Sequence, residues 1–334
     1  MHTMAFQSVL LIAVTILFFA PVSRLSAQVN KLRVGYSSVS AGQSVLWVTK
    51  EAGIFQKNGL DVELLFVQSA SLMAQALAGQ SLPIAIMSGA TAIEGDLKGG
   101  DFLVLLMLKK TPALTYIVSS KSIAKPEQLK GKKLGISRFG SVSDFLVRMA
   151  LRELKIDANK DVSLLQIGGT PLRTAALQAG TIDATVLTVE EKFSAEKFGI
   201  NVLFDLRQLG LEFLTNDVVT TREFLKRDEG TVRRFIKGLV EGIHYYKTRK
   251  KESIDIMARY MRSTDRKVIE VGYDFNAEEY GRKPYVSTTA VQLALDEISR
   301  RNPKAKETRV DQFFDSRFIK ELDATGHIDN LYKQ

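Results

Sequence analysis

Short apolar runs alternate with amphipathic stretches along most of the chain, and this alternation is typical of an α/β protein. Two stretches, 43–57 and 69–78, carry apolar residues at helical spacing, and Gly79 ends the second. The apolar runs around them have the length and composition of strands, and they lie at residues 31–36, 61–67, 83–87, 102–108 and 113–119. The first part of the chain therefore predicts a β-α-β-α-β unit and two further strands.

The same order of elements then begins again. Helical spacing predicts helices over residues 143–154 and 171–179. The apolar runs that flank them predict strands at residues 133–137, 161–167, 182–187, 201–206 and about 214–221. Beyond these strands the pattern is largely helical. Two successive units followed by a helical tail favour two similar lobes rather than one large sheet.

The N-terminus has the features of an export signal. Residues 9–20 form an unbroken apolar run, which falls short of the roughly 20 residues needed to span a bilayer. Pro21 ends this run, and the small residues that follow predict cleavage after Ala27, so that residues 1–27 are a signal peptide. An uncleaved anchor is the alternative, because Leu25 is large and no Lys or Arg precedes the run. We expect a periplasmic protein.

The composition narrows the partners of the mature chain. The full sequence of 334 residues carries 46 basic and 37 acidic side chains, a net charge of +9, and they are interleaved without a basic block. This distribution argues against a nucleic-acid surface, whereas the overall field favours anionic ligands. The absence of cysteine excludes disulfides, thiol catalysis, cysteine-ligated metals and an N-terminal lipid anchor. With 3 histidines and no Ser-His-Asp set or phosphate loop, the sequence predicts binding without catalysis, cofactor or metal.

Several segments rich in Gly, Ala and aliphatic residues follow one another in a recognisable order. They are WVTKEAGIFQKNGLDVELLFV (47–67), ALAGQSLPIAIMSG (76–89), LKGKKLGIS (129–137), LQIGGTPLRTAALQAGTIDATVLTVEE (165–191) and VVTTREFLKR (218–227). Together they cover almost all of the mature chain. In this order they resemble the binding proteins for aliphatic sulfonates, taurine and nitrate, and the related proteins for thiamine pyrimidine precursors.

The resemblance implies a type II periplasmic binding fold, in which two α/β lobes are joined by two crossover strands. One lobe would comprise residues 28–115 and 217–334, including the helical C-terminal segment, and the other residues 116–216. A small-molecule ligand would lie in the cleft, and closure of the lobes would create the surface that the permease of an ABC transporter recognises. We expect a monomer that meets the membrane only through this permease.

Candidate ligand contacts lie where strands end and helices begin, because helix N-termini offer free N–H groups there. Small polar residues fill these loops, and Arg138 adds a guanidinium that can pair with a carboxylate, sulfonate or phosphate. The residues that we predict to bind the ligand are Ser37, Ser38, Gln43, Ser69, Ser88, Gly89, Arg138, Gly140, Ser141, Thr170 and Thr188.

Some of these positions also have a purely structural interpretation. Ser69 can be a simple helix cap, and Ser141 with Asp144 forms a capping-box-like pattern. Arg138 can point to water. The acidic pair at 190–191, near the expected cleft edge, is typical of a solvated helix start.

The leading hypothesis for the function is capture of a small organic anion of the sulfonate, nitrate or carboxylate type. A pyrimidine or aromatic ligand is the alternative, and a sensory module would need the same cleft. An enzyme on this fold is disfavoured, because the resembling pyrimidine synthases use a Cys-rich motif and a sacrificial histidine. This chain has no Cys, and His244 lies in a stretch with a helical pattern.

Overall fold

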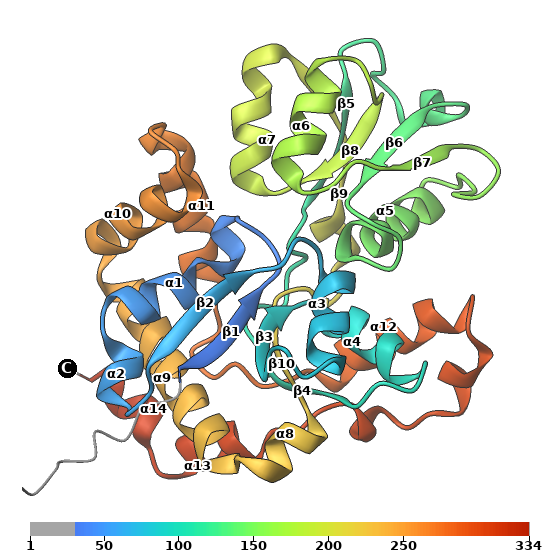
Figure 1. Ribbon diagram of the computed structural model, residues 1–334. Helices are drawn as coiled ribbons and strands as arrows, with labels where there is room; N and C mark the ends of the chain where they lie inside the picture. Colours follow the sequence, from blue (N-terminus) through green and yellow to red (C-terminus); the bar gives the residue numbers. More distant parts are fainter. Residues whose placement is uncertain (1–30, 334) are drawn as a thin grey trace, which may run out of the picture. The chain divides into compact units, whose positions relative to one another are not determined.

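The computed structural model describes residues 31–333, in which helices surround two five-stranded sheets (Figure 1). The predicted signal peptide, residues 1–27, lies outside the described residues. Within residues 31–333, every helix is too short or too polar to cross a membrane.

In the first sheet the strand order is β2-β1-β3-β10-β4. Strand β1 pairs in parallel with β2 and β3, whereas β10 runs antiparallel to both β3 and β4. All residues of β3 and β4 are buried, as expected where helices cover both faces of a sheet. The strands are β1 (Leu32–Tyr36), β2 (Val62–Phe66), β3 (Ile84–Met87), β4 (Phe102–Met107) and β10 (Asp217–Thr221).

The second sheet repeats this arrangement in the order β7-β6-β8-β5-β9. Strand β6 pairs in parallel with β7 and β8, and β5 runs antiparallel to β8 and β9. The shared topology confirms the prediction of two similar α/β lobes. The strands are β5 (Tyr116–Ser120), β6 (Lys133–Ile136), β7 (Ser163–Gln166), β8 (Ala184–Leu187) and β9 (Ile200–Asp205).

The chain crosses from one sheet to the other twice, through residues 108–115 and 206–216. The first crossing leads into β5 and the second into β10, and each of these strands runs antiparallel to a neighbour in its sheet. The two segments bond to each other: Leu108 N donates to Asn216 O (3.1 Å), and Phe213 N donates to Lys110 O (2.8 Å). We propose that they form the hinge between lobe 1 (28–115 and 217–334) and lobe 2 (116–216).

The long helix expected over residues 43–57 is interrupted in the structure. It is divided into the 3-10 turn η1 (Ala41–Gln43) and the helices α1 (Ser44–Glu51) and α2 (Ile54–Lys57). The break lies at Gly53, whose left-handed φ of 69° ends the regular helical path after α1. The apolar spacing continues across this break, so periodicity alone does not reveal it.

Other helices of the two lobes follow strands. Residue ranges were predicted for three of them, α3, α5 and α6. Only the starts of the other two were predicted, because the Gly-Ala-Thr start of α4 has no apolar period and α7 spans only 7 residues. Their bounds are α3 (Ala70–Ala78), α4 (Gly89–Asp96), α5 (Val142–Glu153), α6 (Thr170–Gln178) and α7 (Val189–Ala195), with 3-10 turns η2 (Pro126–Leu129), η3 (Glu196–Phe198) and η4 (Leu206–Leu209).

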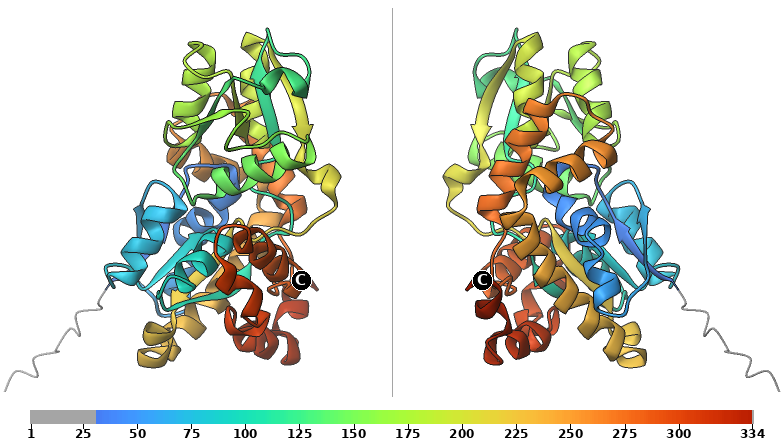
Figure 2. Two further views of the ribbon diagram at one scale, coloured as in Figure 1. Left: turned by 90° about the vertical axis from the view of Figure 1, so that its right-hand side faces the viewer. Right: turned by 90° about the vertical axis from the view of Figure 1, so that its left-hand side faces the viewer.

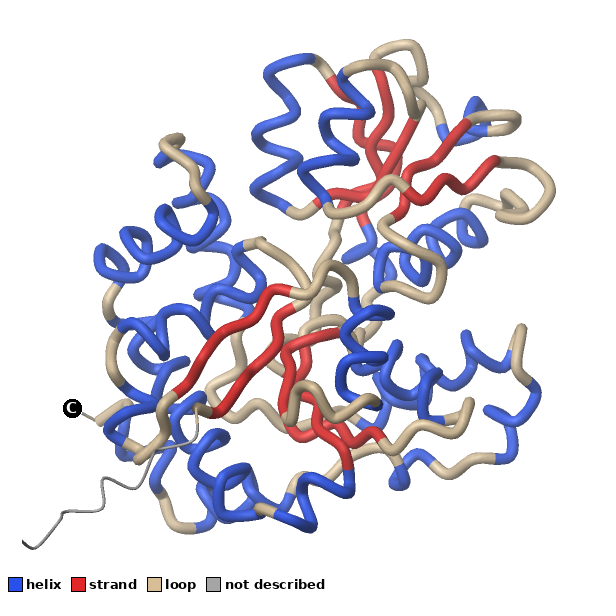
Figure 3. The backbone as a smooth tube through the Cα atoms, viewed as in Figure 1, coloured by secondary structure: helices blue, strands red, loops and turns tan. Residues whose placement is uncertain are grey.

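The C-terminal region is helical, as predicted, and most of it belongs to the side of the first sheet (Figures 2 and 3). Helix α9 packs on α1 and α2, where Phe235 stacks on Phe55 at 5.0 Å. Helix α11 packs against both η1 and α7, and thus contacts both lobes. The elements are α8 (Arg222–Arg227), α9 (Glu229–Thr248), α10 (Lys250–Met261), α11 (Arg266–Glu279), α12 (Thr288–Ser299), η5 (Pro303–Glu307), η6 (Val310–Gln312), α13 (Arg317–Ala324) and α14 (His327–Leu331).

Candidate functional site

A cavity of about 240 Å³ lies where the loops that follow the strands of both sheets meet. Lobe 1, lobe 2 and the two crossover segments all contribute to its wall. Its lining consists of Ser37, Ser38, Val39, Ser40, Gln43, Phe66, Gln68, Ser69, Ala70, Ala113, Leu114, Ser137, Val142, Ser143, Gly169, Thr170, Pro171, Leu172, Arg173, Thr188, Thr215 and Asn216. This volume lies just below the roughly 300–1,000 Å³ of most ligand cavities, so it suits a small ligand.

The structure brings some of the predicted ligand contacts together at this cavity, namely Ser37, Ser38, Gln43, Ser69, Thr170 and Thr188. The others, Ser88, Gly89, Arg138, Gly140 and Ser141, are not part of its lining. Buried Ser88 donates to Leu214 O (3.0 Å) and accepts from Thr91 N, while Gly89 N donates to Asp217 Oδ2 (2.8 Å). Ser88 thus holds the start of α4 against the second crossover segment, and Gly89 holds it against the first residue of β10.

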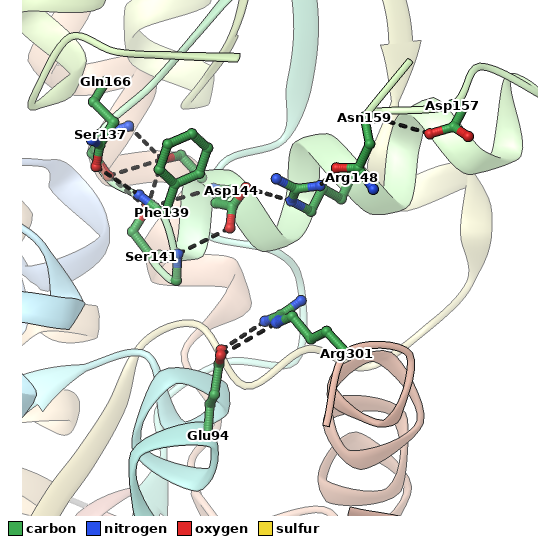
Figure 4. A network of polar contacts seen from close by, with 12 residues as sticks. Glu94, Ser137, Phe139, Ser141, Asp144, Arg148, Asp157, Asn159, Gln166 and Arg301 are labelled. Atoms are coloured by element: carbon green, nitrogen blue, oxygen red, sulfur yellow. Dashed lines mark hydrogen bonds and ion pairs between the residues drawn. The ribbon is translucent and has the colours of Figure 1, made fainter. Parts of the chain in front are cut away.

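The polar groups of the loop before α5 form hydrogen bonds within this region of the chain (Figure 4). Ser141 Oγ accepts from Asp144 N, and Asp144 Oδ2 accepts from Gly140 N (2.9 Å), so the capping interpretation describes this loop. Gly140 has a φ of 72°, which favours glycine. Arg138 is exposed at the surface of the loop. Ser137 and Ser143, which were not predicted, line the cavity instead.

Arg173, on α6, is the charged residue among the described residues that line the cavity. It is only 1% exposed, and its guanidinium donates to Gly168 O (2.8 Å), Thr170 Oγ1 (3.1 Å), Thr185 Oγ1 (3.0 Å) and Val186 O (3.1 Å). These partners are all neutral. Burial lowers the pKa of Arg173 to about 10, which leaves the group charged at neutral pH. A fixed positive charge therefore lies in the cavity wall.

Gln43 organises the opposite wall. Its Oε1 accepts from Ser37 N (2.9 Å) and Ser38 N (3.1 Å), and these two bonds fix which end of the amide is the acceptor. The Nε2 group then donates to Ser37 Oγ (3.0 Å) and to Asn216 Oδ1 (3.2 Å). The loop after β1 and the second crossover segment are thereby tied to one buried side chain.

Helix N-termini from both lobes point polar groups at the same cavity. Ser69 and Thr188 cap α3 and α7 with their hydroxyls. In contrast, α6 begins at Gly169 without a side-chain cap, so its first N–H groups are not occupied by a capping side chain. The positive ends of the α3 and α6 dipoles add to the charge of Arg173.

The acidic pair on α7 is not a solvated helix start, contrary to the sequence interpretation. Glu190 is 2% exposed, and its Oε1 accepts from Ala41 N of lobe 1 (3.0 Å). Glu191 Oε2 accepts from the N and Oγ1 of Thr188 in a capping box. Burial, with the nearby charge of Glu190, raises the pKa of Glu191 to about 8. The helix start is therefore part of the contact between the lobes.

This shift predicts a pH dependence of stability. Folded Glu191 keeps a proton up to about pH 8, whereas the unfolded chain releases it near the ordinary value of 4.5. The native state therefore binds more protons in this window, and stability falls as the pH rises from 4.5 to 8. Glu191→Gln, which keeps the acceptor for Thr188, is expected to flatten this decline by several degrees in thermal melts. Glu127→Gln, an exposed control on η2, should follow the parent, and identical slopes for both variants would contradict the assignment.

The sequence of residues 42–253 matches the family described as NMT1/THI5-like. The chain belongs to the NMT1/THI5-like family. A relative that shares 26% identity over 175 residues is a protein of Haemophilus influenzae, provisionally named as a thiamine biosynthesis protein. This match covers 52% of the present chain and 51% of the relative. The chain spans about half the length of the curated relatives that it matches.

Solved structures place this NMT1/THI5-like protein in the periplasmic binding protein fold. The alkanesulfonate-binding protein SsuA of Xanthomonas axonopodis, bound to MOPS, aligns with a TM-score of 0.67 at 16% identity, over 84% of this chain and 95% of that chain. The periplasmic nitrate-binding protein NrtA of Synechocystis aligns with a TM-score of 0.70 at 14% identity, over 89% of each chain. At these identities the likeness establishes the fold, and the predicted fold is confirmed.

Proposed function

We propose that this protein captures a small organic anion in the interlobe cavity and delivers it to an ABC importer. The observation that carries this proposal is the buried, charged Arg173, whose hydrogen-bond partners are all neutral. A carboxylate or sulfonate beside it would make a charge-assisted contact in surroundings shielded from water. The helix N-termini of α3 and α6 support the same sign of ligand charge.

Contacts between the lobes support capture by closure of the hinge. Glu190 of lobe 2 accepts from Ala41 N of lobe 1, and Thr91 Oγ1 of lobe 1 donates to Gly140 O of lobe 2 (3.1 Å). Partly exposed Arg152 of α5 pairs with buried Glu297 of α12. These bonds form only when the lobes are together, so the conformation described here is one in which a bound molecule would be enclosed.

Delivery to an importer is supported by the fold neighbours, several of which are binding proteins of import systems. One is described as the ligand-binding component of an ABC-type import system of Staphylococcus aureus. In this proposal, residues 1–27 direct export to the periplasm, and the permease recognises the closed lobes. The chain acts by binding and carries out no reaction.

A neutral pyrimidine is the second candidate ligand, and two observations favour it. One relative of the chain is provisionally named as a thiamine biosynthesis protein. The side-chain amides of Gln68 and Asn216 line the cavity, and Asn216 Nδ2, which has no hydrogen-bond partner among the described residues, can donate to a pyrimidine edge.

Thermal unfolding of the purified protein against a ligand panel tests the proposal. The sample is first stripped of ligand by unfolding and refolding, and the panel contains nitrate, sulfonates, carboxylates, pyrimidines and aromatic acids. A ligand at 100 times its Kd adds about 2.7 kcal/mol, which should raise Tm by several degrees. We expect shifts with organic anions and none with their neutral amides. A shift with pyrimidines alone would favour the second candidate, and no shift with any compound would contradict both.

A further inference from the structure

The mouth of the cavity is apolar, and both lobes build it. Among the large apolar side chains of the described residues, Phe66 at the end of β2 is 48% exposed, and Leu172 on α6 is 54% exposed. Both of them line the cavity. A side chain that lines a cavity and is also half exposed must lie where the cavity opens to solvent, so these two residues mark the mouth.

The inner wall has the opposite character. Gln43 and Asn216 are each 2% exposed, and Arg173 is 1% exposed, although all three line the same cavity. Polarity therefore decreases from the inner wall to the mouth. Most ligand cavities have apolar walls and few polar groups. In this cavity the charge lies at the inner end, and the exposed apolar surface lies at the outer end.

Phe66 and Leu172 are held in place by specific neighbours. The ring of Phe66 packs against that of Tyr36 with 5.5 Å between the centroids. Leu172 packs against the backbone of Gly168, and so does Gln68 of lobe 1: a Cβ at Gly168 would lie 2.9 Å from Leu172 Cδ1 and 2.9 Å from Gln68 Nε2. Gln68 of lobe 1 and Leu172 of lobe 2 thus meet at Gly168, so the two lobes contact each other beside the mouth.

We propose that Phe66 and Leu172 determine specificity by holding the apolar part of an organic anion whose charged group lies inward at Arg173. This inference rests on the proposed function and adds the orientation of the ligand and the class of compound. The ligand enters with its charged group first, and its hydrocarbon portion leaves the cavity between the two side chains. Small anions without an apolar portion, such as nitrate or sulfate, would leave the mouth empty and bind weakly.

The arrangement makes a specific prediction about chain length. The first methylenes of a straight-chain anion would be buried at the mouth, and each is expected to raise the affinity about fourfold. Further methylenes would extend into solvent, so the affinity should level off. In a cavity that was closed and apolar at its inner end, longer chains would instead be excluded.

Calorimetric titration with methane-, propane-, pentane- and octanesulfonate, and in parallel with the straight-chain carboxylates, tests this inference. The sulfonate head stays ionised throughout the usual pH range, so that only the chain length changes. The variants are Phe66→Ser and Leu172→Ser. The matched control is Phe139→Ser, because Phe139 is 49% exposed and does not line the cavity.

The parent and the control should gain affinity with chain length and then reach a plateau. Both mouth variants should bind the methyl compound within about twofold of the parent and lose most of the gain with length. The inference would be overturned if the parent bound all chain lengths with equal affinity, or bound longer chains much more weakly. It would also be overturned if the affinity of the mouth variants rose with chain length as much as that of the parent. Binding of no member of either series would refute the proposed function itself.

Discussion

Replacing Arg173 with methionine is expected to lower the free energy of unfolding by about 2–4 kcal/mol and to abolish binding of anions. The guanidinium satisfies Gly168 O, Val186 O and the hydroxyls of Thr170 and Thr185. Methionine fills a similar space but donates to none of these groups, so the buried carbonyls lose their partners. The cavity would also lose the one charge among its described lining residues.

Arg138→Met is the matched control, because Arg138 is the arginine that the sequence favoured, and it is exposed. We expect that variant to stay within about 0.5 kcal/mol of the parent and to keep its ligand affinity. Arg173→Lys tests the charge separately from the hydrogen-bond geometry. Lysine restores a cation, but its single ammonium group cannot reach all four acceptors of the planar guanidinium. Denaturant unfolding and titration with the best anion of the panel give both quantities. Equal anion affinity in Arg173→Met and the parent would refute the role of this charge.

The contrast between Arg138 and Arg173 shows which part of the site can be predicted from the sequence. Arg138 follows a predicted strand within a Gly-containing loop, which is where ligands of α/β proteins bind, and it was the obvious choice. Arg173 lies one turn into α6 and resembles a surface residue of an amphipathic helix. The side chain of Arg173 turns inward because β8 and the Gly168–Thr170 loop provide hydrogen-bond acceptors for its guanidinium. These acceptors come together only when the lobe has folded.

The fold was predicted more completely than the site, for a physical reason. Strand and helix order follows from the period of apolar residues, which is local, and most elements lie where this period indicates. Residues such as Leu114 and Asn216 line the cavity because the crossover segments pass beneath it. No local pattern distinguishes these segments from ordinary connections. Loop contacts likewise depend on which hydroxyls are occupied by helix caps, as Ser141 is.

A buried lysine lies in the first crossover segment beside the contact between the lobes. Lys109 is 2% exposed, and its Nζ donates to Asn276 Oδ1 of α11 (2.9 Å) and lies 5.0 Å from the ring centroid of Phe275. Burial lowers the pKa of Lys109 to about 8, and the nearby Glu190 acts in the opposite direction. Glu190 belongs to α7, so a charge of lobe 2 stabilises a cation in the proposed hinge.

Glu190→Ala is therefore expected to cost about 2–4 kcal/mol in unfolding free energy, because it removes the acceptor of Ala41 N and a counter-charge of Lys109. Glu190→Gln keeps an acceptor and removes only the charge, so it should cost less. If the charge matters through Lys109, the penalty of Glu190→Gln should shrink by about 1 kcal/mol or more in a Lys109→Met background. Additive penalties would show that the two groups are independent.

The pH dependence provides a second readout of the same pair. Folded Lys109 releases its proton at about pH 8, whereas the unfolded chain keeps it until about 10.5. The unfolded state thus binds more protons in this window, and Lys109 makes stability rise with pH from 8 to 10.5. In Lys109→Met, stability should no longer rise with pH in this window. In Glu190→Gln the pKa of Lys109 falls further, so the rise in stability should begin at a lower pH. Since Lys109 lies in the proposed hinge and Glu190 in lobe 2, a coupled pair would mean that the electrostatic energy of the hinge depends on closure of the lobes.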